Sequence, residues 1–180
     1  AYDVMMVDSM DNIKQKFLSF DKPIVISVDS TCYPDSDVIK FYPERPSISH
    51  KYVNSGTYIG YVWALKKMLQ TIKKDNYKCK KINSKVFIDD NSIGNDQRCV
   101  TSFFLNNQDL CELDYEQKIF STLWGMSEED FDFIDYNNIF NKRTNVKTSI
   151  LHGNGGAWNI STEDYYSKLL RTNNYLLDRK

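Results

Sequence analysis

The run Pro23-Ile24-Val25-Ile26-Ser27-Val28-Asp29 constrains the fold more than any other segment of the chain. It is almost continuously apolar, and a proline and an aspartate bound it. A short apolar run between such breakers is typical of a strand that is buried on both faces. The sequence therefore predicts that this segment is a strand of a mixed or parallel sheet.

Helical periodicity appears in several later segments. Apolar residues recur at intervals of three and four over residues 58–72, with lysines between them, which predicts an amphipathic helix. Residues 96–105 predict a second helix. Ser127 with Asp130 three residues later resembles a capping box that would begin a third, and a terminal helix is predicted from Ser161.

Three further stretches read as short strands. Residues 86–88 and 118–120 are apolar or mixed runs next to polar turns, and Val146, Thr148 and Ile150 alternate with polar or small residues. The last of these leads directly into a histidine-containing turn.

Composition excludes some classes of protein. The chain has 180 residues, a net charge of −1 and 41% hydrophobic residues, which indicates one globular unit that can bury a core. The absence of a basic stripe argues against a nucleic-acid partner. The N-terminus has neither the pattern of a secretory signal nor that of a membrane span. Four scattered cysteines make a zinc cluster improbable and leave disulfides and redox compartment open.

The turn Ile150-Leu151-His152-Gly153-Asn154-Gly155-Gly156 contains one of only two histidines. Glycines let a backbone approach an anion closely, successive N–H groups can form an anion-binding concavity, and a neutral imidazole binds divalent cations. With the carboxylate of Asp3, His152 could share a Mn²⁺ or Mg²⁺ ion that carries a nucleotide diphosphate. The plainer alternatives are a tight turn at His152 and a solvated turn residue at Asp3.

Seven short blocks follow one another over residues 1 to about 155. They are Tyr2-Asp3-Val4-Met5, Ser27-Val28-Asp29-Ser30-Thr31-Cys32-Tyr33-Pro34, Tyr52-Val53-Asn54-Ser55-Gly56-Thr57-Tyr58-Ile59-Gly60, Asn95-Asp96-Gln97, Leu113-Asp114-Tyr115, Ile119-Phe120 and His152-Gly153-Asn154-Gly155. Their order resembles the glycosyltransferase domain of the procollagen lysyl hydroxylases.

This resemblance implies a GT-A-type α/β fold with a mixed, largely parallel sheet flanked by helices. Residues 1–155 would form the metal- and sugar-binding part, and residues 156–180 its C-terminal helical tail. The implied activity is Mn²⁺-dependent transfer of glucose from UDP-glucose to galactosyl-hydroxylysine of collagen or a collagen-like protein. The alternatives are UDP-galactose transfer to hydroxylysine, a degenerate module that binds sugar nucleotide or collagen without catalysis, and a different metal-dependent phosphate enzyme.

The first and last blocks carry the implied metal and phosphate contacts. Asp3 resembles the second aspartate of the family's metal-binding acidic motif, and His152 resembles the histidine that completes the protein ligands of the ion. Gly153, Asn154 and Gly155 would then lie along the diphosphate of the donor.

The middle blocks carry the implied sugar contacts. Asn54-Ser55-Gly56 resembles the donor-binding loop before a long helix, with a helix cap by Ser55 as the alternative. Asn95 and Asp96 are assigned to catalysis, where Asp96 would orient the donor or receive the acceptor's proton; the alternative is an acid favoured by a helix N-terminus. Asp29 and Tyr33 resemble residues of a loop that closes over donor or acceptor, or they form a plain turn.

Several positions depart from the family pattern. The first metal aspartate and the nucleotide-binding N-terminal part would precede Ala1, so the chain is predicted to be an incomplete catalyst. The acidic run is interrupted over residues 89–96, which suggests a different acceptor preference, and Trp158 stands where the family has a lysine, which removes a cation near phosphate. No iron-binding hydroxylase signature follows.

The remaining predictions concern partners and location. The resemblance implies a collagen-like acceptor and work in the endoplasmic reticulum or secretory pathway, with no nucleic acid, no membrane segment and a homodimer left open. The abundance of Asn, Lys, Ile and Tyr suggests an AT-rich genome, which is compatible with a viral protein that acts in a host.

Overall fold

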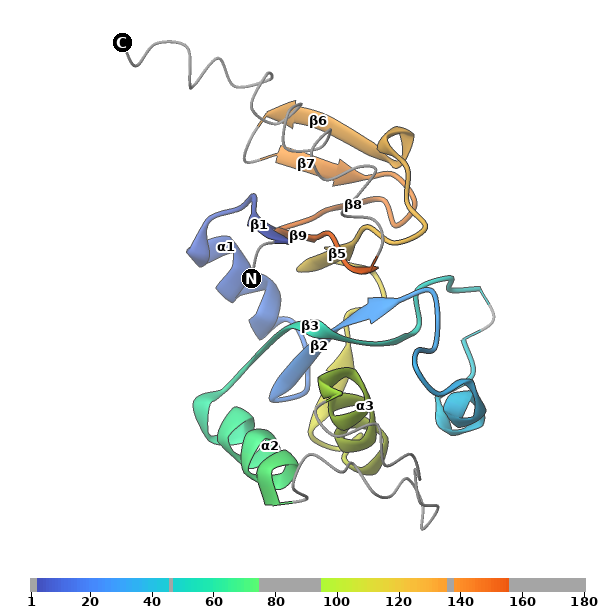
Figure 1. Cartoon of the computed structure of the whole chain (residues 1–180). Helices are drawn as coiled ribbons and strands as arrows, with labels where there is room; N and C mark the ends of the chain where they lie inside the picture. Colours follow the sequence, from blue (N-terminus) through green and yellow to red (C-terminus); the bar gives the residue numbers. More distant parts are fainter. Residues whose placement is uncertain (1–2, 46, 75–94, 136–137, 156–180) are drawn as a thin grey trace. The chain divides into compact units, whose positions relative to one another are not determined.

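A computed structural model describes residues 3–45, 47–74, 95–135 and 138–155 (Figure 1). The elements in chain order are β1 (Val4–Met6), α1 (Met10–Leu18), β2 (Ile24–Asp29), the 3₁₀ helix η1 (Ser36–Phe41), β3 (Tyr52–Gly60), α2 (Val62–Lys74), α3 (Asp96–Asn106), β4 (Cys111–Leu113), β5 (Phe120–Thr122), the 3₁₀ helix η3 (Glu128–Asp130), β6 (Phe131–Asp135), β7 (Asn138–Asn141), β8 (Val146–Lys147) and β9 (Ile150–His152). The chain divides into two compact units. Unit 1 comprises Ala1–Ser19 and Asp114–Lys180, and unit 2 comprises Phe20–Leu113.

Unit 2 is built around β2. This strand lies between β3 and β4, antiparallel to the first and parallel to the second. All residues from Ile24 to Val28 are fully buried. The prediction of a strand covered on both faces is therefore confirmed, and burial of these side chains is a main contribution to the stability of the unit.

Helix α3 packs against β3 and matches its predicted position. Asn95 caps it, because its side-chain oxygen accepts the N–H of Arg98 at 3.0 Å. The predicted inward residues are all buried: Val100, Phe103 and Phe104.

The helix predicted from Tyr58 begins later than expected. Tyr58 and Ile59 belong to β3, where they pair with Ile26 and Val25, and α2 starts at Val62. Both residue types favour strands, and pairing with the buried β2 overrides their helical spacing. A Cβ atom on Gly60 would lie 2.7 Å from the carbonyl oxygen of Pro23, so this junction requires glycine.

Unit 1 contains two small sheets. In the first, β9 lies between β1 and β5, antiparallel to β1 and parallel to β5 (Figure 1). In the second, β6, β7 and β8 follow one another in antiparallel order. One core cluster joins residues of both sheets and their connections: Val7, Leu123, Phe131, Ile139 and Leu151.

The described strands correct three further expectations. The sheets are mixed, but antiparallel pairings outnumber the parallel pairings β2–β4 and β5–β9. The strand expected at 118–120 lies at Phe120–Thr122. Ser127 does bond to Asp130, but the pair closes η3 and leads into β6, because the alternating apolar residues that follow suit a strand. The predicted strand at 86–88 and the C-terminal helical tail lie outside the described residues.

Candidate functional site

Asp3 and His152 lie beside each other at one end of the β1–β9 pair. Val4 pairs with His152, and the N–H of Gly153 donates to the carbonyl of Asp3 at 2.7 Å. Oδ2 of Asp3 lies 3.4 Å from Nε2 of His152. The His152 side chain is 6% exposed and that of Asp3 is 39% exposed, so the pair is anchored in the core and open to solvent on the carboxylate side.

The donor set of this pair suits a divalent cation. Two ligands about 2.1 Å from a common ion lie about 3.0 Å apart at a right angle and about 3.4 Å apart at the tetrahedral angle, which brackets the observed spacing. An imidazole with a carboxylate is acceptable to several first-row metals. Among the described residues no third His, Cys, Asp or Glu joins the two. A bound ion would therefore need additional ligands, such as phosphate oxygens or water.

The turn after β9 is tied to its surroundings by hydrogen bonds. The carbonyl of His152 accepts the N–H groups of Leu123 and Asn154, each at 2.9 Å, and Oδ1 of Asn154 accepts the N–H of Trp124 at 3.0 Å. The N–H of Gly153 is used by Asp3. The proposed anion-binding concavity therefore does not include the N–H groups of Gly153 and Asn154, since both donate within the chain. Close approach of the glycines to a diphosphate stays a prediction.

Gly155 shows why the turn uses glycine. Its φ is +63°, in the left-handed region that side chains disfavour. A Cβ atom there would also lie 3.2 Å from the Trp124 ring. Gly155 therefore lets the chain turn tightly against Trp124.

A buried carboxylate fixes the other end of the β1–β9 pair. Asp8 accepts hydrogen bonds from Asn12 at 2.7 Å, from Ser149 at 2.9 Å and from Lys16 at 3.2 Å. Burial raises the pKa of Asp8, but these bonds and one from the Ser9 N–H outweigh it and lower the pKa to about 2. Asp8 thus joins α1 to the chain that enters β9 and helps to set the position of His152.

Asp114 has a comparable structural role. It is fully buried and accepts the N–H groups of Lys118, Ile119 and Phe120 at 2.8, 2.7 and 2.9 Å. Burial raises its pKa to about 6 despite these bonds. Because its oxygens are used by the backbone that begins β5, Asp114 stabilises a turn.

In unit 2 the predicted sugar-binding segment is a bulge inside β3. Ile26 pairs with Tyr58 and Val28 with Val53, so the residues between Val53 and Tyr58 leave the regular ladder. This corrects the expectation of a loop before a helix and of a cap by Ser55. Bulges re-aim side chains, which suits a segment that contacts a ligand.

Asn54 links the bulge to Asp29. Its Oδ1 accepts the N–H of Gly56 at 2.9 Å, and its Nδ2 donates to Oδ2 of Asp29 at 3.2 Å. The hydroxyl of Ser27 donates to the Asn54 carbonyl at 3.0 Å. The other oxygen of Asp29 accepts the N–H of Thr31 at 3.1 Å, which shapes the turn after β2.

Ser55 is held by two consecutive residues of α3. Its hydroxyl donates to Oδ2 of Asp96 at 3.0 Å, and its N–H donates to Oε1 of Gln97 at 2.7 Å. The amide nitrogen of Gln97 in turn donates to the Val53 carbonyl. Gln97 belongs to one of the blocks that resemble the family, but no sequence motif indicates its role; its position next to Asp96 is the available signal.

The remaining predicted residues of unit 2 differ in environment. Asp96 is exposed in the first turn of α3, where the helix dipole favours an acid. Its position therefore also agrees with the alternative of an acid that stabilises a helix N-terminus. The side chain of Asn95 is engaged as the cap of α3. Tyr33 is 67% exposed. Unit 2 therefore brings Asp29, the bulge and Asp96 together.

Two findings bear on the setting in which the chain works. Cys99 is disulfide-bonded, whereas Cys32 and Cys111 carry free thiols. In the described part of the chain, no helix has the length and apolar character needed to cross a membrane.

Comparison with known proteins gives consistent matches. The family described as PLOD GT domain matches residues 1–170. An uncharacterized protein of Acanthamoeba polyphaga mimivirus is 27% identical over 87% of the chain and 30% of its own length. A procollagen-lysine,2-oxoglutarate 5-dioxygenase of Drosophila melanogaster is 26% identical over 97% of the chain and 23% of its own length. The multifunctional procollagen lysine hydroxylase and glycosyltransferase LH3 of Rattus norvegicus is 24% identical over 86% of the chain and 19% of its own length. The chain thus spans less than a third of each relative.

Proposed function

The chain belongs to the family of PLOD glycosyltransferase domains, and from this premise we propose that it is the metal- and sugar-binding part of a UDP-sugar-dependent glycosyltransferase. The reaction proposed is transfer of glucose from UDP-glucose to galactosyl-hydroxylysine of a collagen-like polypeptide, on a GT-A-type fold. Two relatives support the acceptor class, because their names specify procollagen lysine.

The observation that carries this proposal is the 3.4 Å approach of the Asp3 carboxylate to the His152 imidazole. These two side chains would hold Mn²⁺, which when bound neutralises charge on the departing UDP. The main chain of His152 is fixed by its place in β9 and by the bonds to its carbonyl, and its ring is buried with 6% exposure, which supports an imidazole that is ordered before the ion binds. Such prior ordering reduces the cost of binding.

The proposed sugar contacts lie on the β3 bulge and the start of α3. Asp96 keeps an exposed carboxylate whose Oδ2 is oriented by the Ser55 hydroxyl. In this proposal Asp96 bonds a sugar hydroxyl or accepts the proton of the acceptor, and Asn54 with Asp29 lines the same surface of unit 2. Asn95 supports this arrangement by capping α3.

The test is Mn²⁺-dependent release of UDP from a panel of UDP-sugars, with and without a galactosyl-hydroxylysine peptide. Release from UDP-glucose that the peptide stimulates is the expected result. Release that requires UDP-galactose and bare hydroxylysine would instead support the galactosyltransferase. Product mass separates the two, because they start from different acceptors.

A non-catalytic module that binds sugar nucleotide or collagen is the second candidate. Two observations favour it. Among the described residues no third His, Cys, Asp or Glu joins Asp3 and His152, and the Gly153 and Asn154 amides already donate within the chain. Mn²⁺ and UDP binding without UDP release from any donor would support it.

The proposed location is the endoplasmic reticulum or secretory pathway. The disulfide at Cys99 supports this, since structural disulfides are typical of oxidising compartments. The mimivirus relative supports the further proposal that the chain is a viral protein that acts in a host.

A further inference from the structure

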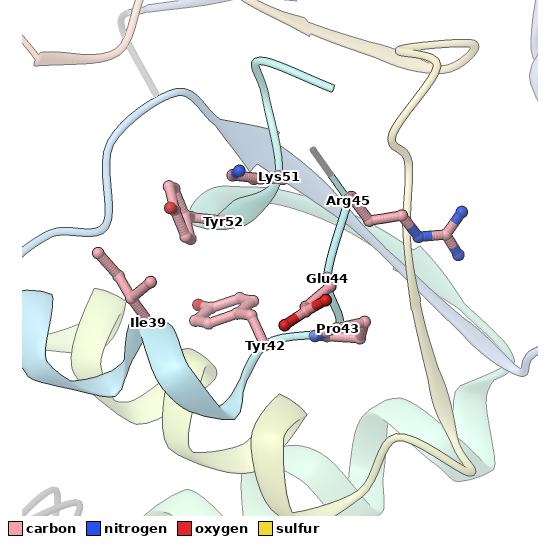
Figure 2. Close-up of a pocket in the computed structure, with 7 residues that line it drawn as sticks. All are labelled: Ile39, Tyr42, Pro43, Glu44, Arg45, Lys51 and Tyr52. Carbon is pink, nitrogen blue, oxygen red and sulfur yellow. The ribbon is translucent and has the colours of Figure 1, made fainter. Parts of the chain in front are cut away.

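A pocket with a volume of about 210 Å³ opens in unit 2 between the end of η1 and the start of β3 (Figure 2). It is lined by Ile39, Tyr42, Pro43, Glu44, Arg45, Lys51 and Tyr52. None of these residues has a role in the site described above.

Two tyrosine rings form a rigid apolar wall. The rings of Tyr42 and Tyr52 lie 5.2 Å apart between centroids and perpendicular to each other. Tyr42 is only 8% exposed, packs on Phe104, and accepts the N–H of Val53 with its hydroxyl at 3.3 Å. The wall is therefore ordered without a ligand, which lowers the cost of binding one.

The charged groups around this wall have opposite signs. Nζ of Lys51 lies 5.8 Å from the Tyr52 ring centroid. Figure 2 shows the Glu44 carboxylate directed toward the Tyr42 ring, while Arg45 extends away from both tyrosines. Because Arg45 extends away, one carboxylate and one ammonium remain next to the two tyrosines, and this pair does not suit a dedicated anion or cation site. They do provide an acceptor and a donor next to an apolar surface.

The volume of the pocket limits the kind of ligand that it can bind. Pockets for complete small molecules usually measure about 300–1,000 Å³, so this one is suited to one or two residues of a polypeptide. Proline-rich segments dock on aromatic-lined grooves. Their extended helix makes no internal hydrogen bonds. Its C=O groups are therefore available to Lys51, and the N–H groups of its non-proline residues are available to Glu44.

The pocket adjoins the proposed sugar-binding residues along the chain. The N–H of Lys51 donates to the carbonyl of Asp29 at 3.0 Å, and Tyr52 pairs with Asp29 across the β2–β3 ladder. Val53, which bonds to Tyr42, directly precedes Asn54. The pocket and the bulge of β3 are thus next to each other along β3 in unit 2.

We propose that this pocket binds a proline-containing, extended segment of the acceptor polypeptide, next to the residue that is modified. The proposal rests on the proposed function in one respect, namely that the acceptor is a polypeptide. A relative acts on procollagen lysine by name, and collagen sequences are rich in proline.

The test is direct binding of two short fluorescent peptides to the 180-residue chain, without donor or metal. Both peptides contain hydroxylysine, and they differ only in carrying proline or alanine at the flanking positions. The wild type is expected to bind the proline peptide several-fold more tightly. Tyr52→Ala should raise the Kd of the proline peptide about tenfold and abolish the preference for proline over alanine. Tyr52→Phe should keep the wild-type Kd and the wild-type preference.

Trp63→Ala and Lys67→Glu are matched controls, because both side chains are exposed on α2 of the same unit. They should leave both Kd values unchanged. If circular dichroism shows that Tyr52→Ala does not fold, Glu44→Gln and Lys51→Gln are used in its place. Each of them should weaken binding of the proline peptide.

Equal affinity for the two peptides, or a proline preference that persists in Tyr52→Ala, Glu44→Gln and Lys51→Gln, would overturn the proposal. So would Tyr52-dependent binding of a galactosyl-glucose disaccharide with no binding of bare peptide, which would make the pocket a sugar subsite. Because no donor is present, failure of sugar transfer with proline selectivity intact contradicts the proposed reaction and leaves the pocket assignment standing.

Discussion

The side-chain amide of Gln97 takes the place of a neighbouring strand beside Ser55. Its Oε1 accepts the Ser55 N–H at 2.7 Å and its Nε2 donates to the Val53 carbonyl, on the strand that forms one edge of the sheet. Because Asp96 accepts the Ser55 hydroxyl, the first turn of α3 fixes both the main chain and the side chain of Ser55. The bulge of β3 is therefore held open in one conformation.

Replacing Gln97 should loosen this bulge. Gln97→Ala removes both bonds, at a cost of about 1–2 kcal/mol in unfolding free energy. We expect hydrogen exchange of the Ser55 amide to accelerate strongly, and the KM for UDP-sugar to rise more than kcat falls. Gln97→Glu keeps the acceptor for Ser55 but loses the donor to Val53, so its effect should be intermediate.

Gln70→Ala on the exposed face of α2 is the control for the loss of a glutamine side chain. It should leave exchange at Ser55 unchanged. Wild-type exchange at Ser55 in the Gln97→Ala protein would show that the bulge holds its shape without Gln97.

Substitution of Asp3 or His152 is expected to reduce the affinity of the chain for Mn²⁺. Asp3→Asn and His152→Ala should each raise the Kd for Mn²⁺ by about tenfold or more, since even groups that only orient ligands contribute 10–100-fold. The measurement is free Mn²⁺ by electron paramagnetic resonance during titration. Asp11→Asn, which changes an exposed acid on α1 of the same unit, should bind Mn²⁺ like the wild type. Unchanged affinity in both site variants would exclude these residues as ligands.

Apolar patterns in the sequence predicted the elements that are buried on both faces or along one face. The continuous apolar run gave β2, and the spacing of Val100, Phe103 and Phe104 gave α3, because burial alone determines both. The apolar spacing from Tyr58 predicted a helix start that is wrong, because Tyr58 and Ile59 pair with β2 as part of a strand. A local sequence pattern that is compatible with both a helix and a strand does not show whether a neighbouring strand is available for pairing.

The candidate site was predictable only in part for a related reason. A histidine at a strand end with glycines after it was visible, and the structure places Asp3 beside it. The bulge at residues 54–57 was not visible, because a break in ladder register leaves no periodic trace. Gln97 was also missed, because a side chain that bonds to backbone groups depends on position in space and not on a motif.

Gly155 offers a test of the turn next to the proposed metal pair. Gly155→Ala should lower the unfolding free energy by about 1–2 kcal/mol, because a side chain at φ +63° is strained and its Cβ would press on Trp124. Gly155→Asn should cost less, since asparagine adopts this conformation more readily. Urea denaturation measures both values. Equal costs for the two variants would assign the effect to the contact with Trp124 and not to backbone strain.

Asp8 makes the stability of the chain depend on pH in the acid range. Its pKa is about 2 in the folded chain and 3.8 for an ordinary aspartate, so the unfolded chain binds the proton more tightly. Its contribution is therefore fully present above pH 3.8 and is lost as the pH falls toward 2. At about 1.4 kcal/mol per pKa unit, the contribution is about 2 kcal/mol.

Asp8→Asn removes the titrating group while keeping the shape of the side chain, and it should remove this part of the pH dependence. Urea denaturation between pH 5 and pH 2 should show an unfolding free energy that falls about 2 kcal/mol less in the variant than in the wild type. Asp21→Asn changes an exposed aspartate and should follow the wild-type curve. Parallel curves for wild type and Asp8→Asn would mean that Asn12, Lys16 and Ser149 do not favour the ionised carboxylate, and that the link between α1 and the start of β9 is held by other contacts.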